Sequence, residues 1–239
     1  MLVRLGARRR PVLVVYLQAI PLFFRNPSLL LAPLFTGVLG VLVQMFGGPQ
    51  VGDVTGGLMS GLLQLLIFLF NCFGLGISVI IADNIWRNGN GSFEDGWEEG
   101  RRKAGNIFMA ALGLNFVVYV PQLLAGLLPA IAIDVLTVIA FFFLIYTIPA
   151  AAIGSVPGFM SLNASIERVR ENYPMALGLA VCFLLLYWVL GTLVIPLYTW
   201  QLGITSVLLA AAARAIVLGY FALVLARGYT SVAFSGRRY

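Results

Sequence analysis

The segment SFEDGWEEGRRKAGNIF, from Ser92 to Phe108, decides how this sequence is interpreted. It is dense in charge, yet it lies in a chain of 239 residues that is 61% hydrophobic and only 10% charged. Soluble domains carry about a quarter charged residues, and the mean hydropathy of this chain is +0.98. We therefore interpret the segment as a polar helix on a membrane surface that leads into a membrane-spanning helix.

The order of charges within this segment predicts a surface helix over residues 92–104. Ser92 is a typical N-cap, with Asp95 three residues later as in a capping box. Acidic residues fill the first turns, and the helix dipole favours cations in the last turn, which contains Arg101, Arg102 and Lys103. The order of charges therefore matches the helix dipole.

One face of this helix is expected to lie against lipid, because Phe93, Trp97, Gly100 and Ala104 follow the spacing 0, 4, 7, 11.

A second surface helix is predicted over residues 161–172, in SLNASIERVRENYPMAL, with Arg168 and Arg170 near its end. The same spacing is followed there by Leu162, Ile166, Val169 and Tyr173. A third, over residues 11–25, precedes the first span, and its residues on this template are Leu13, Leu17, Ile20 and Phe24.

Six segments are long and apolar enough to cross a bilayer, which requires about 20 residues of helix. They are residues 28–46, 58–82, 107–128, 131–153, 175–197 and 204–226. The strict alternation typical of membrane β-strands is not seen. We therefore expect an all-α polytopic membrane protein with one domain over residues 1–239. A surface helix followed by a two-span hairpin would be used three times, with the amphipathic helices on the cytoplasmic side.

Positive charge gathers at one end of each predicted hairpin. All fifteen Lys and Arg residues except Arg214 precede the first span, follow the last, or lie in the connectors 83–106 and 154–174. Cations next to spans are retained in the cytoplasm, so both termini are expected there, in a plasma (inner) membrane protein. The sequence pI of about 9.7 then indicates contact with anionic lipid headgroups rather than with nucleic acid.

The residue types restrict the chemistry that the chain is expected to perform. Histidine is absent, which removes the usual acid–base residue and the imidazole metal ligands. Cys72 and Cys182 stand alone in apolar runs, as small core residues do. No paired-carboxylate, P-loop or nucleophile-elbow spacing occurs. The sequence therefore predicts no catalytic residue, no metal and no cofactor.

Arg214 is the one cation inside a predicted span, where an arginine costs about 2.5–3.5 kcal/mol on insertion scales. We expect it to pair with Asp134 at the start of the fourth span, supported by Asn71 or Asn115. A pair that only fixes helix packing, a ligand or ion site, and a snorkelling side chain are the three interpretations that remain open. A small-residue stripe beside it, which should let a neighbouring helix approach closely, contains Ala211, Ala215 and Gly219.

The two segments GSFEDGWEEGRRKAGNIF and SLNASIERVRENYPMAL also resemble small six-span bacterial membrane proteins of largely uncharacterised families. These include the membrane region attached to some bacterial glycerophosphodiester phosphodiesterases. The resemblance covers Ile77 to Leu185. It implies no catalytic residues in this chain, because the metal-dependent chemistry of those fusions belongs to the phosphodiesterase domain.

Three functions follow from these observations. The first is a non-catalytic scaffold or accessory subunit that binds lipids or other membrane proteins. The second is a small transporter or permease subunit with a polar cavity near Arg214. The third, which no motif supports, is an enzyme acting on lipid through surface carboxylates such as Asp83, Glu94 or Asp95.

Overall fold

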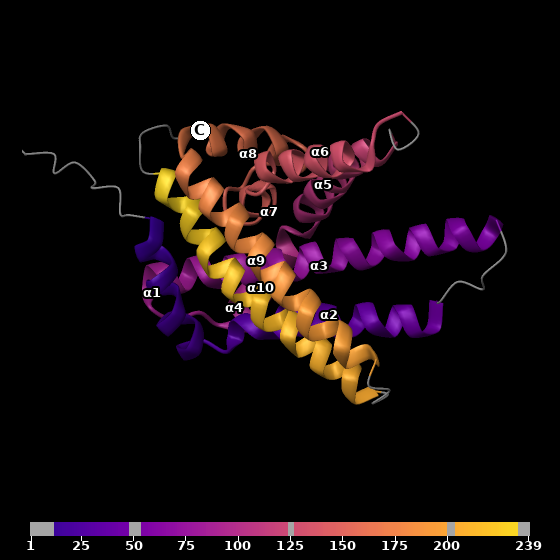
Figure 1. The fold of residues 1–239 in the computed structure, drawn as a ribbon. Coiled ribbons are helices and arrows are strands. Elements are labelled where there is room, and N and C mark those ends of the chain that lie inside the picture. Colours follow the sequence, from indigo (N-terminus) through magenta and orange to yellow (C-terminus); the bar gives the residue numbers. More distant parts are fainter. Residues whose placement is uncertain (1–11, 48–53, 124–126, 200–203, 234–239) are drawn as a thin grey trace, which may run out of the picture.

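The computed structural model describes residues 12–47, 54–123, 127–199 and 204–233, and this part of the chain is helical apart from short connectors (Figure 1). Both termini, and residues 124–126 of the predicted span 107–128, lie outside the described residues. The helices are α1 (Val12–Arg25), α2 (Ser28–Gly47), α3 (Val54–Asn88), α4 (Phe93–Arg102), α5 (Ala104–Leu123), α6 (Ala130–Phe143), α7 (Thr147–Ala152), α8 (Met160–Glu171), α9 (Tyr173–Thr199) and α10 (Ile204–Ala233).

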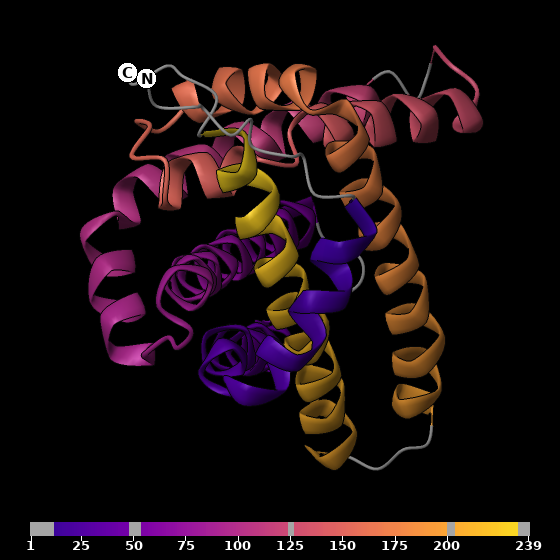
Figure 2. The same cartoon turned by 90° about the vertical axis from the view of Figure 1, so that its left-hand side faces the viewer.

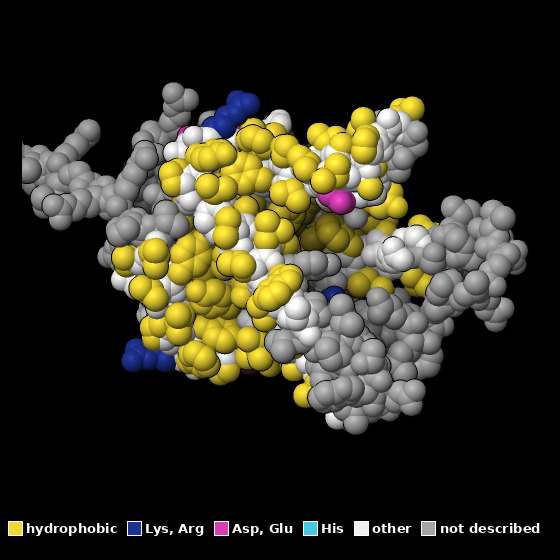
Figure 3. Space-filling model, viewed as in Figure 1, with side chains coloured by type: hydrophobic (Ala, Val, Ile, Leu, Met, Phe, Trp, Pro, Cys, Tyr) yellow, Lys and Arg dark blue, Asp and Glu magenta, His cyan; other side chains and the backbone are white. Residues whose placement is uncertain are grey.

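Five helical segments of the described chain are long and apolar enough to cross a membrane: Gly61–Asn88, Ala104–Leu123, Ala130–Ala152, Tyr173–Leu190 and Leu208–Ser231. A sixth is formed if Leu13–Arg25 and Ser28–Gly40, which meet at 81°, are counted as one bent span. Apolar side chains cover most of the face shown in Figure 3, with charged residues mainly near its edges. The prediction of an all-α protein with helices fit to span a membrane is confirmed.

Neighbouring long helices pack against each other in sequence order, α2 with α3, α5 with α6 and α9 with α10. The adjoining ends of α2 and α3, and of α5 and α6, lie on the right of Figure 1, whereas α4, α8 and the end of α10 lie in its left half. Figure 2 shows α2 and α3 nearly end-on beside the length of α10, so these helices cross steeply.

The core lies where α3, α7 and the second half of α10 meet. An unbroken run of each helix is buried there: residues 76–83, 147–152 and 221–226. A helix that is apolar on all sides is suited to the interior of a bundle. α7 fits because its sequence, TIPAAA, presents mostly small side chains to its neighbours.

The predicted span 131–153 matches the helical segment Ala130–Ala152, which contains a turn at residues 144–146. α6 ends at Phe143, and α7 begins at Thr147. Pro149 supplies the physical reason, because a proline ring clashes with the carbonyl four residues earlier and lacks an N–H for the helical ladder. The break places Pro149 in the first turn of α7, where a proline is tolerated.

A second proline accounts for the bend between α1 and α2. Pro27 disfavours helical backbone at Asn26, and Asn26 instead turns its buried side chain back to donate a hydrogen bond to the Leu22 carbonyl at 2.8 Å. On α1 the exposed apolar residues are Leu13, Leu17, Ile20 and Phe24. These are the four that the predicted surface helix over residues 11–25 places on one face.

Helix α4 begins as predicted but turns a different face inward. The Ser92 hydroxyl accepts a hydrogen bond from the Glu94 N–H at 3.2 Å, which confirms the cap. The buried residues of α4 are Gly96 and Gly100, and both pack directly against isoleucines of α3. Gly100, predicted to face lipid, therefore belongs to a helix–helix contact.

The small-residue stripe of α10 forms the close contact that the sequence predicts. Ala211 packs against Gly37 of α2, where a Cβ on the glycine would lie 3.6 Å from the alanine Cβ. Further along α10, a Cβ added to Gly219 would lie 3.4 Å from the Leu29 carbonyl oxygen. Ala215, between them, is buried. Small side chains thus let α2 and α10 cross at short range.

The glycine contact between α4 and α3 is testable with two alanine substitutions. At Gly100 an added Cβ would lie 2.6 Å from Cγ1 of the fully buried Ile77, whereas at Gly105 nothing lies within 4 Å. Gly100→Ala should lower the free energy of unfolding by about 1–3 kcal/mol through overpacking. Gly105→Ala should raise it by up to about 1 kcal/mol through helix propensity. Thermal unfolding in mild detergent measures both, and equal shifts would contradict the close contact.

Candidate functional site

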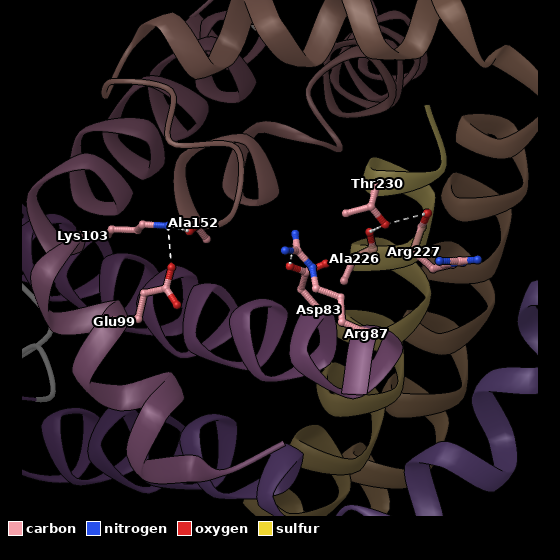
Figure 4. A network of polar contacts seen from close by, with 8 residues as sticks. All are labelled: Asp83, Arg87, Glu99, Lys103, Ala152, Ala226, Arg227 and Thr230. Atoms are coloured by element: carbon pink, nitrogen blue, oxygen red, sulfur yellow. Dashed lines mark hydrogen bonds and ion pairs between the residues drawn. The ribbon is translucent and has the colours of Figure 1, made fainter. Parts of the chain in front are cut away.

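Polar side chains meet around the buried core at the ends of α3, α7 and α10 (Figure 4). At the junction of α4 and α5, the Lys103 ammonium donates to the Glu99 carboxylate and to the Ala152 carbonyl, both at 2.7 Å. Glu99 and Lys103 have the i,i+4 spacing that favours pairing on a helix. Lys103, which is predicted to lie on the membrane-surface helix, caps the Ala152 carbonyl at the end of α7.

The end of α3 is tied to α10 through Trp86. Its indole N–H donates to the Leu223 carbonyl at 2.9 Å, and the Arg227 guanidinium carbon lies 5.2 Å from the centroid of the tryptophan ring. One turn away, Asp83 and Arg87 form an ion pair of 2.7 Å. The nearly buried carboxylate of Asp83 thus receives a cation from its own helix, as a buried charge requires.

Ser165 of α8 satisfies the break between α6 and α7. Its hydroxyl donates to the Phe143 carbonyl at 2.8 Å and accepts from the Tyr146 N–H at 3.0 Å. Both backbone groups would otherwise be left unpaired in the interior, at a cost of about 1–3 kcal/mol each. Nothing in the sequence indicates this role of Ser165, because a serine on a surface helix is ordinarily solvated.

Helix α8 turns its small polar residues, not its predicted apolar face, toward the core. Its buried residues are Ser161, Ser165 and Val169, while Ile166 is half-buried and Arg170 is exposed. Only Val169 of the predicted lipid-facing residues is fully buried. Hydroxyl groups are expected to face inward where they can bond to interrupted backbone inside a bundle. Apolar side chains are expected to face outward where the surroundings are lipid.

Arg168 lies between α8 and the end of α10. Its guanidinium carbon is 5.0 Å from the centroid of the Tyr229 ring, and it pairs with the Glu171 carboxylate at 3.4 Å. Stacking on an aromatic face stabilises an arginine by about 0.5–1 kcal/mol at exposed sites. Of the cations assigned to the surface helices, Arg101, Arg102 and Arg170 are the exposed ones.

A polar pocket of about 410 Å³ opens where α3 ends and α4 begins, and it is lined by Asn84, Asn88, Asn90, Gly91, Ser92 and Asp95. The backbone of the connector is held in place on both sides. Gly89 adopts a φ of +84°, typical of a residue that ends a helix. The Ser28 hydroxyl at the start of α2 donates to the Gly91 carbonyl at 2.8 Å.

The polar side chains of this pocket are available to a ligand. Within the described chain, no hydrogen bond or ion pair involves the side chains of Asn84, Asn88, Asn90 or Asp95. Amides both donate and accept hydrogen bonds, and a carboxylate accepts them. The pocket therefore suits hydroxyl or ammonium groups. The only sequence signal for it is the density of Asn and Gly in DNIWRNGNGS, from Asp83 to Ser92.

The predicted pair of Arg214 and Asp134 is not formed, which corrects that expectation. Both side chains are exposed, and the ion pairs within the described residues are Asp83–Arg87, Glu99–Lys103 and Glu171–Arg168. The physical reason is topological, because α6 packs on α5, α8 and α9, whereas α10 contacts α2 through Ala211, one turn before Arg214.

The two amides proposed as supports for that pair lie elsewhere in the bundle. Asn71 of α3 and Asn115 of α5 are both half-buried. The side-chain oxygen of Asn71 is buried without a hydrogen-bond partner. The polar network expected from the sequence is therefore not assembled, and the polar cavity near Arg214 stays a prediction.

On α4, the two aromatic residues predicted to meet lipid lie in a cluster at the protein surface. Trp97 is partly exposed, stacks on Phe93 with centroids 6.1 Å apart, and contacts Phe35 and Phe73 edge-on. Aromatic residues of this kind are typical of the membrane–water interface. The cluster lies on the helix whose first turn contributes to the polar pocket.

Comparison with known proteins found no matching family model, no similar curated protein and no similar solved structure. The resemblance to six-span bacterial families therefore stays a prediction. The class that the structure defines is a helical protein with five or six helices fit to span a membrane.

The bridging role of Ser165 predicts the effect of removing its hydroxyl. Ser165→Ala should lower the free energy of unfolding by about 1–3 kcal/mol, since a buried carbonyl and a buried N–H lose their partner. The control is Thr205→Val, which removes an exposed hydroxyl on α10 and should change stability little. Thermal unfolding of both variants in the same detergent makes the comparison, and a Ser165→Ala variant as stable as the control would exclude the bridge.

Proposed function

We propose that this protein is a non-catalytic integral membrane protein, a scaffold or accessory subunit that binds lipid headgroups on one membrane face. The observation that carries the proposal is the polar pocket at the α3–α4 connector. Its amide side chains and its single carboxylate make no hydrogen bonds within the described chain, and the connector backbone is held by Ser28. The lipid class that fits is anionic and hydroxyl-bearing, with its hydroxyls in the pocket and its phosphate at the exposed arginines of α4.

The arrangement of α4 supports this assignment. Asp95 in the first turn lines the pocket, Trp97 is partly exposed in the middle, and Arg101 and Arg102 are exposed at the end. One short helix thus offers a hydroxyl acceptor, an interfacial aromatic ring and two cations for phosphate. Charge-assisted bonds from arginine to phosphate are among the stronger hydrogen bonds.

The charged groups nearest the core support a non-catalytic role. Asp83 and Glu99 are each held by a cation of the same helical segment, and Lys103 is bound to both Glu99 and a backbone carbonyl. Groups engaged in this way hold helix ends together. A reactive carboxylate would instead need to reach a substrate atom within hydrogen-bond distance.

The proposed orientation places three hairpins in the plasma membrane with both termini, α4 and α8 in the cytoplasm. It is supported by the exposed cations Arg101, Arg102 and Arg170, which belong to the helices in the left half of Figure 1. The connection between α5 and α6, on the other side of the same view, carries the exposed apolar residue Leu127. Cations retained on the cytoplasmic side give this orientation.

Lipid binding is tested with the double variant Asn84→Ala/Asn88→Ala. Each lost amide removes hydrogen bonds of about 0.5–1.5 kcal/mol, so affinity for phosphatidylglycerol should fall about tenfold. Native mass spectrometry of the detergent-solubilised protein titrated with phosphatidylglycerol or phosphatidylcholine measures this. The control is Asn163→Ala, which removes an exposed amide on α8. Unchanged preference for phosphatidylglycerol in the double variant would rule out the pocket as the headgroup site.

The orientation is tested by labelling single cysteines in intact cells with a membrane-impermeant thiol reagent. In a background in which Cys72 and Cys182 are replaced by alanine, Leu127→Cys should react from outside. Arg102→Cys should react only after the cells are permeabilised, because it faces the cytoplasm. Labelling of Arg102→Cys in intact cells would overturn the proposed topology.

A further inference from the structure

Two charged side chains of the apolar helices, Arg214 and Asp134, have no partner among the residues that the structure describes. Arg214 lies within Leu208–Ser231 and Asp134 within Ala130–Ala152, both segments fit to span a membrane. Each is exposed, and neither takes part in an ion pair or hydrogen bond found in the described part of the chain. A charge placed in hydrocarbon costs about 2.5–3.5 kcal/mol on insertion scales. Both charges therefore need a partner from outside this copy of the chain.

The exposure of Arg214 is unusual because its neighbours on the same stripe of α10 are buried. Ala210 and Ala211, one turn before it, are 4% and 3% exposed, and Phe221, two turns after it, is 2% exposed. Ala215, the next residue, is 2% exposed, so the small-residue stripe stays buried at this level and the exposed side chain of Arg214 lies beside it.

Helix α6 is weakly covered by the rest of the described chain. Only Ile133 is buried along its length, while Ile131 is 75% and Val135 is 52% exposed. Asp134 lies between these exposed apolar residues. A helix with so much apolar surface and one acidic residue is suited to pack against a second helix that offers a cation.

We propose that two copies of this chain associate by packing α6 of one copy beside α10 of the other, so that Asp134 of each pairs with Arg214 of its neighbour. Charge complementarity supports this occupant, since Arg214 and Asp134 are a cation and an anion without a partner in the described part of the chain, each exposed on a segment fit to span a membrane. A two-fold interface contains every residue contact twice. Two Asp134–Arg214 pairs would therefore form, and all four charges would be paired. The proposal is independent of the headgroup pocket at α3 and α4.

A charge exchange between copies tests it. Two differently tagged copies are co-expressed and co-purified in mild detergent. Arg214→Glu in both copies, or Asp134→Arg in both copies, brings like charges together, and co-purification should fall at least tenfold. When one copy carries Arg214→Glu and the other Asp134→Arg, one of the two symmetric contacts joins the introduced glutamate to the introduced arginine, and the other joins the native pair. Co-purification of this mixed pair should return to near the wild-type amount.

The mixed pair distinguishes association between copies from an ion pair within one chain. Each of the two chains carries one substitution, so an ion pair within either chain would be broken and could not be restored by mixing. Failure of the mixed pair to exceed either single variant would overturn the proposal, as would wild-type association of the single variants. A loss of phosphatidylglycerol binding in Arg214→Glu with association unchanged would assign the arginine to lipid phosphate instead.

Cysteine crosslinking keeps the test decisive if a charge variant folds poorly. In the background without Cys72 and Cys182, one tagged copy carries Arg214→Cys and the other Asp134→Cys. Mild oxidation should give a crosslinked species that contains both tags. The matched control replaces Asp134→Cys by Phe116→Cys, which is also exposed but lies on α5. Equal crosslinking of the control, or no crosslinked species with Asp134→Cys, would contradict the proposed interface.

Discussion

The hydroxyl of Ser165 replaces hydrogen bonds that the backbone loses where α6 gives way to α7. In a membrane protein, irregular backbone is tolerated only where other protein groups satisfy its N–H and carbonyl groups. Because Ser165 does so, the chain can change direction inside the bundle and place the short helix α7 at its centre. The contacts of α7 with α3 and α5, and the capping of its last carbonyls by Lys103, depend on this turn.

Two seams of small residues determine how the remaining helices approach this centre. Gly96 and Gly100 bring α4 onto α3, and Ala211 meets Gly37 between α10 and α2. Apolar burial alone cannot drive helix association in lipid, since the tails of the lipid are as apolar as the side chains. Close van der Waals packing and satisfied polar groups then decide the arrangement. The glycine seam also positions the first turn of α4 beside the polar pocket.

The charged residues fall into two groups that the structure treats differently. Those at the helix ends, such as Lys103 and Asp83, are engaged with neighbouring carboxylates, carbonyls or arginines and so stabilise the fold. Arg214 and Asp134 have no such partner within the described residues and lie on helices that could cross a membrane. The first group explains how one end of the bundle is held together. The second group is exposed on the protein surface, where it supports the proposed contact between two copies of the chain.

The sequence by itself determined the helices and their apolar character, the cap at Ser92 and the small-residue stripe at Ala211, because these depend on local spacing and composition. It could not place the inward side of α8, the pairing of the backbone break by Ser165, or the separation of Arg214 from Asp134. Each of these depends on which helix lies beside which, and local periodicity contains no information about that. Only the tertiary structure decided that Ser165 faces a broken backbone while two opposite charges remain unpaired.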